Sequence, residues 1–449
     1  MNAKNRFLSR RERLHPTLRD AVLILPAKFE GDRTDDGFGY YTTRYGYEYW
    51  RQDSDFLYLT GISQSKCVLV ITGKDEIEEH LFHEPRNAEH ELWFGERMGA
   101  EQLGAISGIT RLHPLAELDD FLAQAFQQHA QIHYPFGADM ALDTRILGIV
   151  NRLNTPRNIR NGMRTPASIS DPRKQIHEQR KLKDAVEQAH IRECIDITAN
   201  AFDSLLRNTR PGLYEYELEA DIGHTFRRHG AANHAYNPIV ASGGNACCLH
   251  YTANNCAIRD GDLILVDVGC EKNGYNADIT RSFPANGRFL PAQREIYQIV
   301  LDAQLAAIAA IRPGTPLSRP FDVCAEVISC GLLALGLLQG TLHDVLASKA
   351  YKRFFMHGSG HFIGLDTHDV GAPSVNGQED VFRPGMVTTV EPGIYIRPAD
   401  DVPECYWHLG VRIEDIVLVT SEGNEVLSKH IPKEIHAVEL AMQTQGDKA

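Results

Sequence analysis

Two stretches of the chain carry a carboxylate in the same sequence setting. They are GDLILVDVG at residues 261–269 and GMVTTVEPG at residues 385–393. In both, an apolar run leads from a glycine to an acid, Asp267 or Glu391, and another glycine follows two residues later. A carboxylate at the end of an apolar strand is costly to bury unless another group compensates its charge. The pattern therefore predicts that each strand delivers its acid to a cation.

A second acid follows each of these strands at a matched distance. Asp278 lies four residues after Gly274, and Glu414 lies four residues after Gly410. Matched offsets at both acid pairs indicate an internal repeat. We therefore expect four carboxylates to converge on metal ions between two halves of a duplicated domain.

The repeat extends upstream of the acids. The tripeptide Arg-Pro-Gly recurs at residues 210–212 and 312–314, each time after an amphipathic helix. A further helical segment follows each tripeptide, at residues 215–229 and 320–338. The two halves thus share the order helix, tight turn, helix, histidine-bearing loop and acidic strands.

Histidines narrow the choice of metal. His357, His361 and His368 lie between the two sets of acids, and His250 precedes the first set. Imidazole in a carboxylate-rich site suits Mn²⁺, Co²⁺, Zn²⁺ or Fe²⁺ better than Ca²⁺. Two such ions about 3.5–4 Å apart can share bridging carboxylates and activate a water molecule at neutral pH.

The elements that must position these residues fall into two predicted domains. Residues 1–172 alternate strands and helices, which indicates an α/β domain. Its strands are expected at residues 21–27, 67–73, 80–84 and 131–135, and one helix at 115–130. His80, His83 and His90 are interpreted as surface residues. The charged segment around Pro172 is predicted to be the boundary.

Residues 173–449 are predicted to form an α+β domain, with an apolar helix face from Ile191 to Leu205 and an antiparallel ribbon at 262–269 and 275–283.

Composition excludes several function classes. With 43% hydrophobic and 23% charged residues, the chain is typical of globular proteins. A net charge of −13 argues against nucleic acids and anionic membranes as partners. No apolar run approaches the ~20 residues of a membrane span. Nine cysteines without paired spacing favour a reducing compartment, and we expect a cytoplasmic protein.

The order Asp267, Asp278, His361, Glu391, Glu414 resembles the five-ligand pattern of the pita-bread metallopeptidases, which include methionine aminopeptidase, aminopeptidase P and prolidase. The resemblance covers about residues 175–435. It is carried by these segments: HYTANN (250–255), LVDVGCEKNGYNADITRSFP (265–284), FFMHGSGHFIGLDTHDVG (354–371), TVEPGIYI (389–396) and GVRIEDIVLV (410–419). The N-terminal segments YWRQDSDFLYLTGI (49–62) and ELWFGERMG (91–99) are most similar to aminopeptidase P, which removes the residue before a proline. Ser359 and Thr367 depart from the family pattern, which usually has aliphatic residues there.

The resemblance implies a role for each residue. Asp278 and Glu414 would bridge two ions, Asp267 would hold one ion, and His361 and Glu391 would hold the other. Mn²⁺ is the expected metal, with Co²⁺, Zn²⁺ or Fe²⁺ as alternatives. Glu391 would also shuttle protons.

The remaining residues are assigned to the substrate. His250 and His368 would act on the peptide and on developing charge, and His357 would line the proline pocket. Tyr395 and Arg412 are expected at the substrate site, with Arg412 also paired to an acid near the metals. Trp93 would reach an active-site rim from a neighbouring subunit. Asp53 and Asp55 are candidates for binding the free amine.

The resemblance leaves alternatives open. A prolidase would cleave only Xaa-Pro dipeptides and would need a cation for the dipeptide carboxylate, for which Arg383 and Arg397 are candidates. A non-catalytic peptide-binding module usually loses the metal ligands, and a creatinase-like hydrolase uses no metal. The expected partners are peptides with proline second and further copies of the chain, as a homodimer or homotetramer.

Overall fold

The chain forms two compact units, which the computed structural model describes over residues 3–28, 50–371, 373–375 and 377–443. The division between the units falls between Arg180 and Lys181. Within the described residues, the proposed domains 1–172 and 173–449 differ from these units in one element, helix α8 (Arg173–Arg180). Tyr49, the first residue of one aminopeptidase P-like segment, lies outside the described residues. Among the described helices, none combines the length and the hydropathy that a membrane crossing needs.

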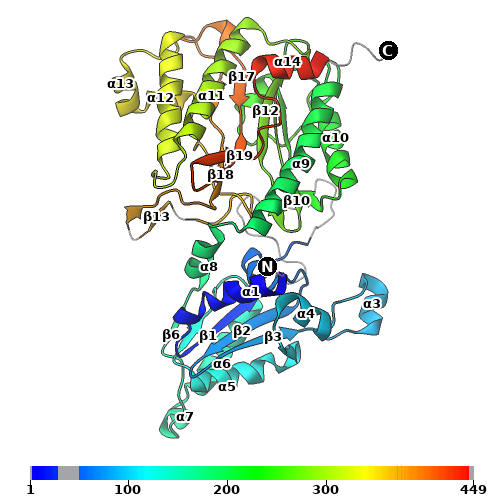
Figure 1. Cartoon of the computed structure of the whole chain (residues 1–449), viewed down its shortest axis with the longest axis vertical. Helices are drawn as coiled ribbons and strands as arrows, with labels where there is room; N and C mark the ends of the chain where they lie inside the picture. Colours follow the sequence, from blue (N-terminus) through cyan, green and yellow to red (C-terminus); the bar gives the residue numbers. More distant parts are fainter. Residues whose placement is uncertain (1–2, 29–49, 372, 376, 444–449) are drawn as a thin grey trace. The chain divides into compact units, whose positions relative to one another are not determined.

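The first unit is built on a six-stranded mixed sheet (Figure 1). Its strand order is β4-β3-β2-β1-β5-β6. Strand β2 is antiparallel to both neighbours, whereas β4, β5 and β6 each run parallel to the strand beside them. The strands predicted in this region are confirmed, with small shifts at their ends. The bounds are β1 (Ala21–Pro26), β2 (Cys67–Gly73), β3 (Ile77–His83), β4 (Arg111–Pro114), β5 (Gln131–His133) and β6 (Ser168–Ser170).

Two helices pack on one face of this sheet. The predicted helix at 115–130 is confirmed as a short 3-10 turn, η2 (Leu115–Glu117), followed by α5 (Leu118–Gln128). Phe126 of α5 and Ile146 of α6 (Met140–Leu153) share a buried core with Val22 and Phe82 of the sheet. The other helices are α1 (Ala3–Glu12), η1 (His15–Thr17), α2 (Ser54–Thr60), α3 (Ala88–Phe94), α4 (Ala100–Ser107) and α7 (Pro156–Arg160).

The interpretation of His80 and His83 as surface residues is wrong. Both side chains lie on β3, an inner strand, and the residues are only 5% and 8% exposed. The Nδ1 atom of His80 is 3.1 Å from Nε2 of His113, and its ring packs against Phe121. The side chain of His90 lies outside the described part of the chain.

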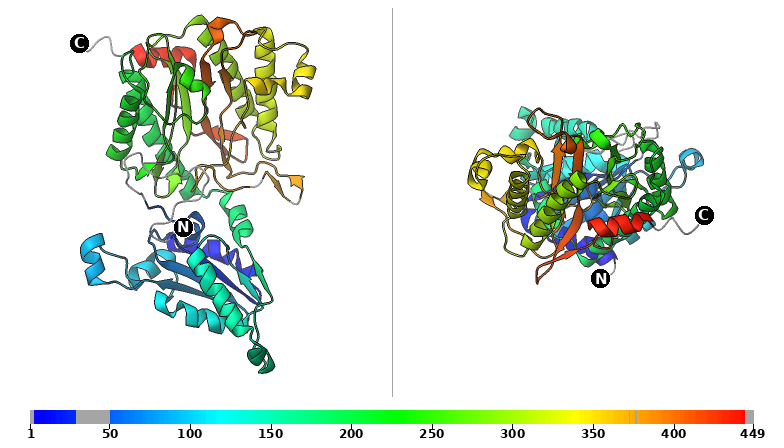
Figure 2. Two further views of the ribbon diagram at one scale, coloured as in Figure 1. Left: turned by 180° about the vertical axis from the view of Figure 1, so that it is seen from behind. Right: turned by 90° about the horizontal axis from the view of Figure 1, so that it is seen from above.

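The second unit consists of two similar halves. In each half, two long helices precede an antiparallel strand pair. The first half has α9 (Ala185–Asn208), α10 (Glu215–Arg228), β9 (Leu263–Val268) and β12 (Ile279–Pro284), and the second has α11 (Pro291–Ala310), α12 (Arg319–Ala334), β15 (Val387–Val390) and β18 (Asp415–Val419). The green helices α9 and α10 lie on one side of the strands, and the yellow-green helix α11 and the yellow helix α12 lie on the other (Figures 1 and 2).

Backbone contacts repeat between the halves as well. Gly212 and Gly314, the last residues of the two Arg-Pro-Gly turns, have positive φ angles of 94° and 85°. The N–H of Gly212 donates to the carbonyl of Ile258, and the N–H of Gly314 donates to that of Phe382, both at 2.9 Å. The predicted duplication is therefore present in the backbone of the second unit.

A short ribbon lies between the two strands of each acidic pair. In the first half it is β10 (Cys270–Lys272) with β11 (Tyr275–Asn276), and in the second it is β16 (Gly393–Ile396) with β17 (Leu409–Arg412). The remaining elements are β7 (Asn233–His234), β8 (Ile239–Ser242), η3 (Gly243–Cys247), α13 (Leu342–Ser348), η4 (Ala350–Arg353), β13 (Ser374–Val375), β14 (Gln378–Glu379), η5 (Glu404–Tyr406), β19 (Asn424–Val426) and α14 (Ile435–Gln443).

Candidate metal centre

Strand register brings the acids of each half to one end of their ribbon. Val268 of β9 pairs with Ile279 of β12, so Asp267 and Asp278 flank this pair. In the second half Val390 of β15 pairs with Asp415 of β18, so Glu391 follows one strand and Glu414 precedes the other. Each half thus brings its two acids to the same end of its own ribbon.

The glycine two residues after each first acid is explained by close backbone approach. A Cβ atom at Gly269 would lie 1.7 Å from the carbonyl oxygen of Ala277. A Cβ atom at Gly393 would lie 2.5 Å from the hydroxyl of Tyr395 and 2.9 Å from the carbonyl oxygen of Val411. Any side chain at either position would force the strands apart, next to an acid of the site.

The two ribbons bring their acids together with His361. Three groups of candidate ligands have donor atoms that all lie within 4.8 Å of one another. Their members are Asp267, Asp278 and Glu414; His361, Glu391 and Glu414; and Asp278, His361 and His368. Asp278, Glu414 and His361 each belong to two groups, so these three side chains occupy the middle of the cluster.

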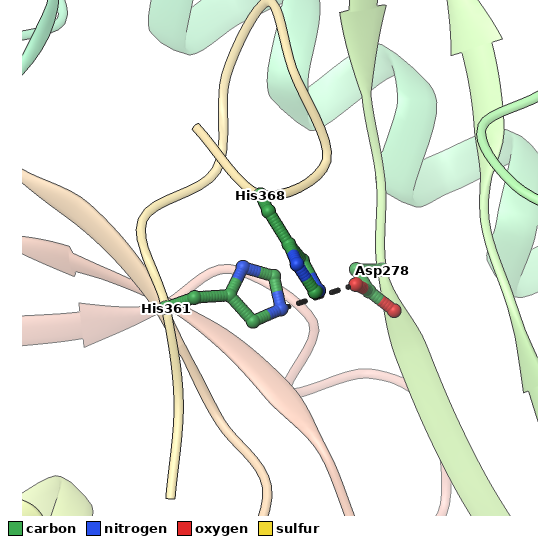
Figure 3. Close-up of side chains that lie close together, drawn as sticks. All are labelled: Asp278, His361 and His368. Atoms are coloured by element: carbon green, nitrogen blue, oxygen red, sulfur yellow. Dashed lines mark ion pairs between the residues drawn. The ribbon is translucent and has the colours of Figure 1, made fainter. Parts of the chain in front are cut away.

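His361 presents one nitrogen to this cluster. Its Nδ1 atom is 2.9 Å from the carbonyl oxygen of Phe362, so Nδ1–H donates there and leaves Nε2 free to act as a ligand. Nε2 is 3.3 Å from Asp278 and 3.7 Å from Glu391. The rings of His361 and His368 are 4.2 Å apart, and both are directed toward Asp278 (Figure 3).

Arg412 holds Asp267 and Tyr395 in place. Its guanidinium donates to the carboxylate of Asp267 at 2.6 Å and to the hydroxyl of Tyr395 at 2.8 Å. It also donates to Thr280, whose hydroxyl donates to Glu414 at 2.8 Å. Arg412 is 3% exposed and therefore has the position of a buried partner to the acids.

The acids outnumber the cations that the chain supplies. Burial raises the pKa of Glu414 well above its usual value, and Asp278, Glu391 and Asp267 raise it further. Burial also raises the pKa of Glu391, to about 7, against the opposing effect of His361 and Arg412. Burial lowers the pKa of His361, but Asp278 and Glu391 outweigh it and raise the value to about 9.

This donor set fits divalent metal ions. Four carboxylates converge with the imidazoles of His361 and His368, and Arg412 compensates mainly Asp267, whose pKa it holds below the usual value against the effect of burial. Buried like charges are stable only with further positive charge or with bound protons. Metal ions would supply this charge, and the mixture of oxygen and imidazole donors suits the transition metals named above.

The acids open into a cavity of about 700 Å³. His250, His357 and His368 line it together with the five candidate ligands. Burial lowers the pKa of His357 to about 4, and the nearby charge of Arg412 adds to this effect. Burial also lowers the pKa of His368 to about 4, with a further contribution from His361. Nε2 of His357 lies 2.8 Å from the hydroxyl of Tyr395, which connects it to Arg412.

Trp93, Asp53 and Asp55 do not belong to this cluster. Trp93 lies on α3 of the first unit, where it is 76% exposed. Asp53 caps helix α2 by accepting from the N–H of Phe56. Asp55 is buried in an ion pair with Arg180. This pair compensates the charge of Asp55, so the presence of an acid here does not require a substrate amine.

Sequence reasoning missed two residues of the site. The hydroxyl of Tyr236 lies between the carboxylates of Asp267 and Asp278 and is within hydrogen-bonding distance of both. Asn237 lines the cavity beside it. Both belong to the turn between β7 and β8, and neither carries a charge or a spacing that would single it out.

Comparison with known families agrees with this geometry. The model of metallopeptidase family M24 matches residues 189–421, and the model of the aminopeptidase P N-terminal domain matches residues 7–134. The chain belongs to the M24 metallopeptidases. Its N-terminal domain assigns it to the aminopeptidase P type, so the predicted fold, an α/β domain followed by a duplicated pita-bread domain, is confirmed.

Individual relatives cover nearly the whole chain. The Xaa-Pro aminopeptidase of Escherichia coli strain K12 is 41% identical over 403 residues, which are 88% of this chain and 90% of that protein. The structure of aminopeptidase PepP from Pseudomonas aeruginosa is 39% identical, covers 98% of both chains and has a TM-score of 0.91. A zinc-substituted E. coli aminopeptidase P in complex with product is 37% identical, covers 98% of both chains and also has a TM-score of 0.91.

Proposed function

We propose that this protein is a dinuclear-metal exopeptidase that releases the N-terminal residue of peptides with proline in second position. One observation carries the proposal: five metal-ligand side chains and three further histidines line a single cavity. Two metal ions held there would activate water and polarise the carbonyl that is attacked. Mn²⁺ is the proposed metal, because carboxylate oxygens dominate the donor set.

The proposed ligand roles follow the three groups of donors. Asp278, Glu414 and His361 each belong to two groups, and the two carboxylates among them, which offer two oxygens each, are the proposed bridges. Asp267 would hold one ion, and His361 and Glu391 would hold the other. Arg412 keeps the carboxylate of Asp267 in one orientation through its 2.6 Å contact.

The other residues act on the peptide. Glu391 borders the cavity and would take a proton from water and pass it to the leaving nitrogen. His250 and His368 would donate N–H groups to the oxygen on which negative charge develops. His357, held by Tyr395, would contact the proline ring. A prolyl nitrogen has no N–H, so the site needs no acceptor for one.

The dipeptidase alternative is not favoured. A dipeptidase needs a cation for the carboxylate of its substrate. Among the described residues that line the cavity, Arg412 is the one Arg or Lys, and it pairs with Asp267. Arg383 pairs with Asp380, and Arg397 donates to the carbonyl of Cys247. A non-catalytic module and a creatinase-like hydrolase are not favoured either. The chain belongs to the metallopeptidases, and it keeps all five candidate metal ligands.

We also propose a homodimer or homotetramer in the cytoplasm. Leu92 and Trp93 are 79% and 76% exposed on the short helix α3, which supports an interface with another copy of the chain. In that assembly Trp93 would reach the rim of a neighbouring active site, as the sequence resemblance implies. All nine cysteines are free thiols, which supports a reducing compartment.

Metal removal and matched tripeptides test the proposed function. The protein is treated with a chelator, reloaded with Mn²⁺, Co²⁺ or Zn²⁺, and assayed on Xaa-Pro-Yaa and Xaa-Ala-Yaa. We expect no activity without metal and, after reloading, release of the first residue from the proline peptide only. Metal-independent hydrolysis, or equal rates on both peptides, would refute the proposal.

A further inference from the structure

A buried glutamate that does not line the cavity accepts five hydrogen bonds. Glu215, the first residue of α10, is 0% exposed. Its Oε1 atom accepts from the N–H and the hydroxyl of Ser242 at 2.8 and 2.7 Å and from the side-chain amide of Asn245 at 2.9 Å. Its Oε2 atom accepts from the hydroxyl of Tyr251 at 2.8 Å and from the N–H of Cys256 at 2.9 Å.

All four partners belong to one segment, residues 242–256, which we term the His250 segment. Ser242 and Asn245 precede His250, whereas Tyr251 and Cys256 follow it. The carboxylate therefore fastens the segment on both sides of His250. Between these attachments, Leu249, His250 and Thr252 line the cavity.

A second glutamate on the same helix face extends this attachment. Glu219, one turn after Glu215, accepts from the side-chain amide of Asn254 at 2.9 Å. Asn254 is 1% exposed and has a positive φ of 45°. Its amide also donates to Pro238 and accepts from the N–H of Val240. Helix α10 thus holds the His250 segment through two carboxylates.

The charge of Glu215 is compensated by hydrogen bonds rather than by an ion pair. Among the described residues, no Lys, Arg or His pairs with it, and its five donors are neutral. A buried carboxylate is costly, so all of its hydrogen bonds must be present together. This requirement fixes the segment in one conformation.

The second half of the unit shows that the backbone does not require this carboxylate. The N–H of Glu215 donates to the carbonyl of Cys256, and the equivalent N–H of Leu317 donates to that of Asp380, both at 3.0 Å. The second half thus makes the same backbone contact with a leucine. The acid is present only in the half whose segment carries His250.

We propose that Glu215 is a positioning residue that holds the His250 segment, and with it the imidazole of His250, in the geometry of the reaction. This inference rests on the proposed function and deepens it. A group that stabilises developing charge must be placed closely, since a displacement of about 1 Å can cost about 100-fold in rate. A segment of this length would otherwise sample many conformations.

The test replaces the carboxylate by an isosteric amide. In Glu215→Gln one oxygen becomes an NH₂ group, which cannot accept from the N–H of Cys256 or Ser242. We expect kcat on Xaa-Pro-Yaa to fall about tenfold or more, with a smaller change in KM and with bound metal unchanged. Glu187→Gln is the matched control. Glu187 is also buried in the first turn of a helix, where it accepts from Tyr275 and Asp184, and the variant should keep wild-type kcat.

Two further measurements separate positioning from general stability. In a His250→Ala background, Glu215→Gln should lower kcat no further. Hydrogen exchange of peptides from residues 242–256 should speed up in Glu215→Gln and stay unchanged in Glu187→Gln. If Glu215→Gln does not fold, Tyr251→Phe takes its place, because it removes one of the donors to Glu215. This variant should also lower kcat and speed up hydrogen exchange in the His250 segment.

Unchanged exchange in the His250 segment, or an equal loss of kcat with and without His250, would overturn the inference. The exchange measurement does not depend on activity. If the wild-type protein failed to cleave Xaa-Pro peptides, the proposed function would fail, while exchange would still decide whether Glu215 holds the segment.

Discussion

Glu391 combines two tasks in one side chain, because it is both a candidate ligand and the proposed proton shuttle. In Glu391→Gln the amide oxygen can still donate a lone pair to a metal, but the group cannot carry protons. We expect turnover of Xaa-Pro-Yaa to fall about 100-fold or more while the fold survives. Steady-state kinetics measure this, with the exposed Glu422→Gln as control. Turnover within about threefold of wild type would remove Glu391 from the role, because a general base supplies more than that.

Asp278 and His368 lie side by side but are proposed to do different work (Figure 3). Asp278→Ala removes a proposed bridge, so the purified variant should lose at least one of two metal ions. His368→Ala should keep both ions and lose turnover, because its N–H acts on the peptide. Elemental analysis of the folded variants decides this. A His368→Ala protein that has lost metal would make His368 a ligand.

The charged residues of the site could be predicted from the sequence, whereas their neutral neighbours could not. Asp267, Asp278 and Glu414 end or begin apolar strands, where a charge is conspicuous. Tyr236 is a neutral aromatic in a turn, and only the folded chain places its hydroxyl between two carboxylates. Glu215 is an acid in an amphipathic helix, where sequence does not distinguish a buried carboxylate from a solvated one.

At the scale of elements, a buried ion pair fastens the loop that carries His368 to the start of α9. Lys183 and Asp369 are 2.8 Å apart, and each side chain is 1% exposed. Lys183→Met removes this ion pair while the carboxylate of Asp369 stays buried, so we expect a loss of about 3–5 kcal/mol in the free energy of unfolding. Chemical denaturation measures this. The exposed Lys429→Met should change stability by less than about 0.5 kcal/mol.

The pair has an internal check. The double variant Lys183→Met with Asp369→Asn also removes the buried negative charge and should recover part of the lost stability. If Lys183→Met alone were as stable as wild type, the pair would contribute nothing to this loop.

In the first unit, Asp55 joins α2 to α8 in a way that depends on pH. Its carboxylate contacts Arg180 at 2.7 Å and His177 at 3.0 Å. Burial raises the pKa of Asp55, but Arg180 and His177 outweigh burial and hold it below the usual 3.8. Stability from the pair is therefore complete above pH 3.8 and is lost as the pH falls through the lower folded-state pKa.

Asp55→Asn tests this dependence. At neutral pH the variant should be less stable than wild type by about 3–5 kcal/mol, because the buried Asp55–Arg180 ion pair is lost. The difference in denaturation midpoint should be present above pH 3.8 and should shrink as the pH falls toward 3. A difference that does not change with pH would show that Asp55 acts through packing alone.

Element types were predictable where periodicity is strong, as in α9 and the two acidic ribbons. The burial of His80 and His83 could not be predicted, because polar residues on a strand are normally interpreted as exposed to solvent when the neighbouring elements are unknown. On β3, His80 lies on the face that Phe121 covers, whereas His83, three residues later, lies on the opposite face. Tertiary packing thus decided what local pattern could not.

At the scale of the whole molecule, function depends on duplication. Each half of the second unit contributes two acids at the end of one ribbon, and neither half alone has a complete donor set. The second half adds His361, while the first adds His250 on the segment that Glu215 holds. A fold of two similar halves therefore carries a site whose halves are chemically different.

The most direct test of the central claim is product analysis of a pentapeptide with proline in second position, incubated with the metal-loaded protein and followed by mass spectrometry. We predict release of the first residue, a tetrapeptide product that begins with proline, and no cleavage of the matched peptide with alanine second. An intact pentapeptide, alongside rapid hydrolysis of an Xaa-Pro dipeptide, would contradict this account and identify the protein as a dipeptidase.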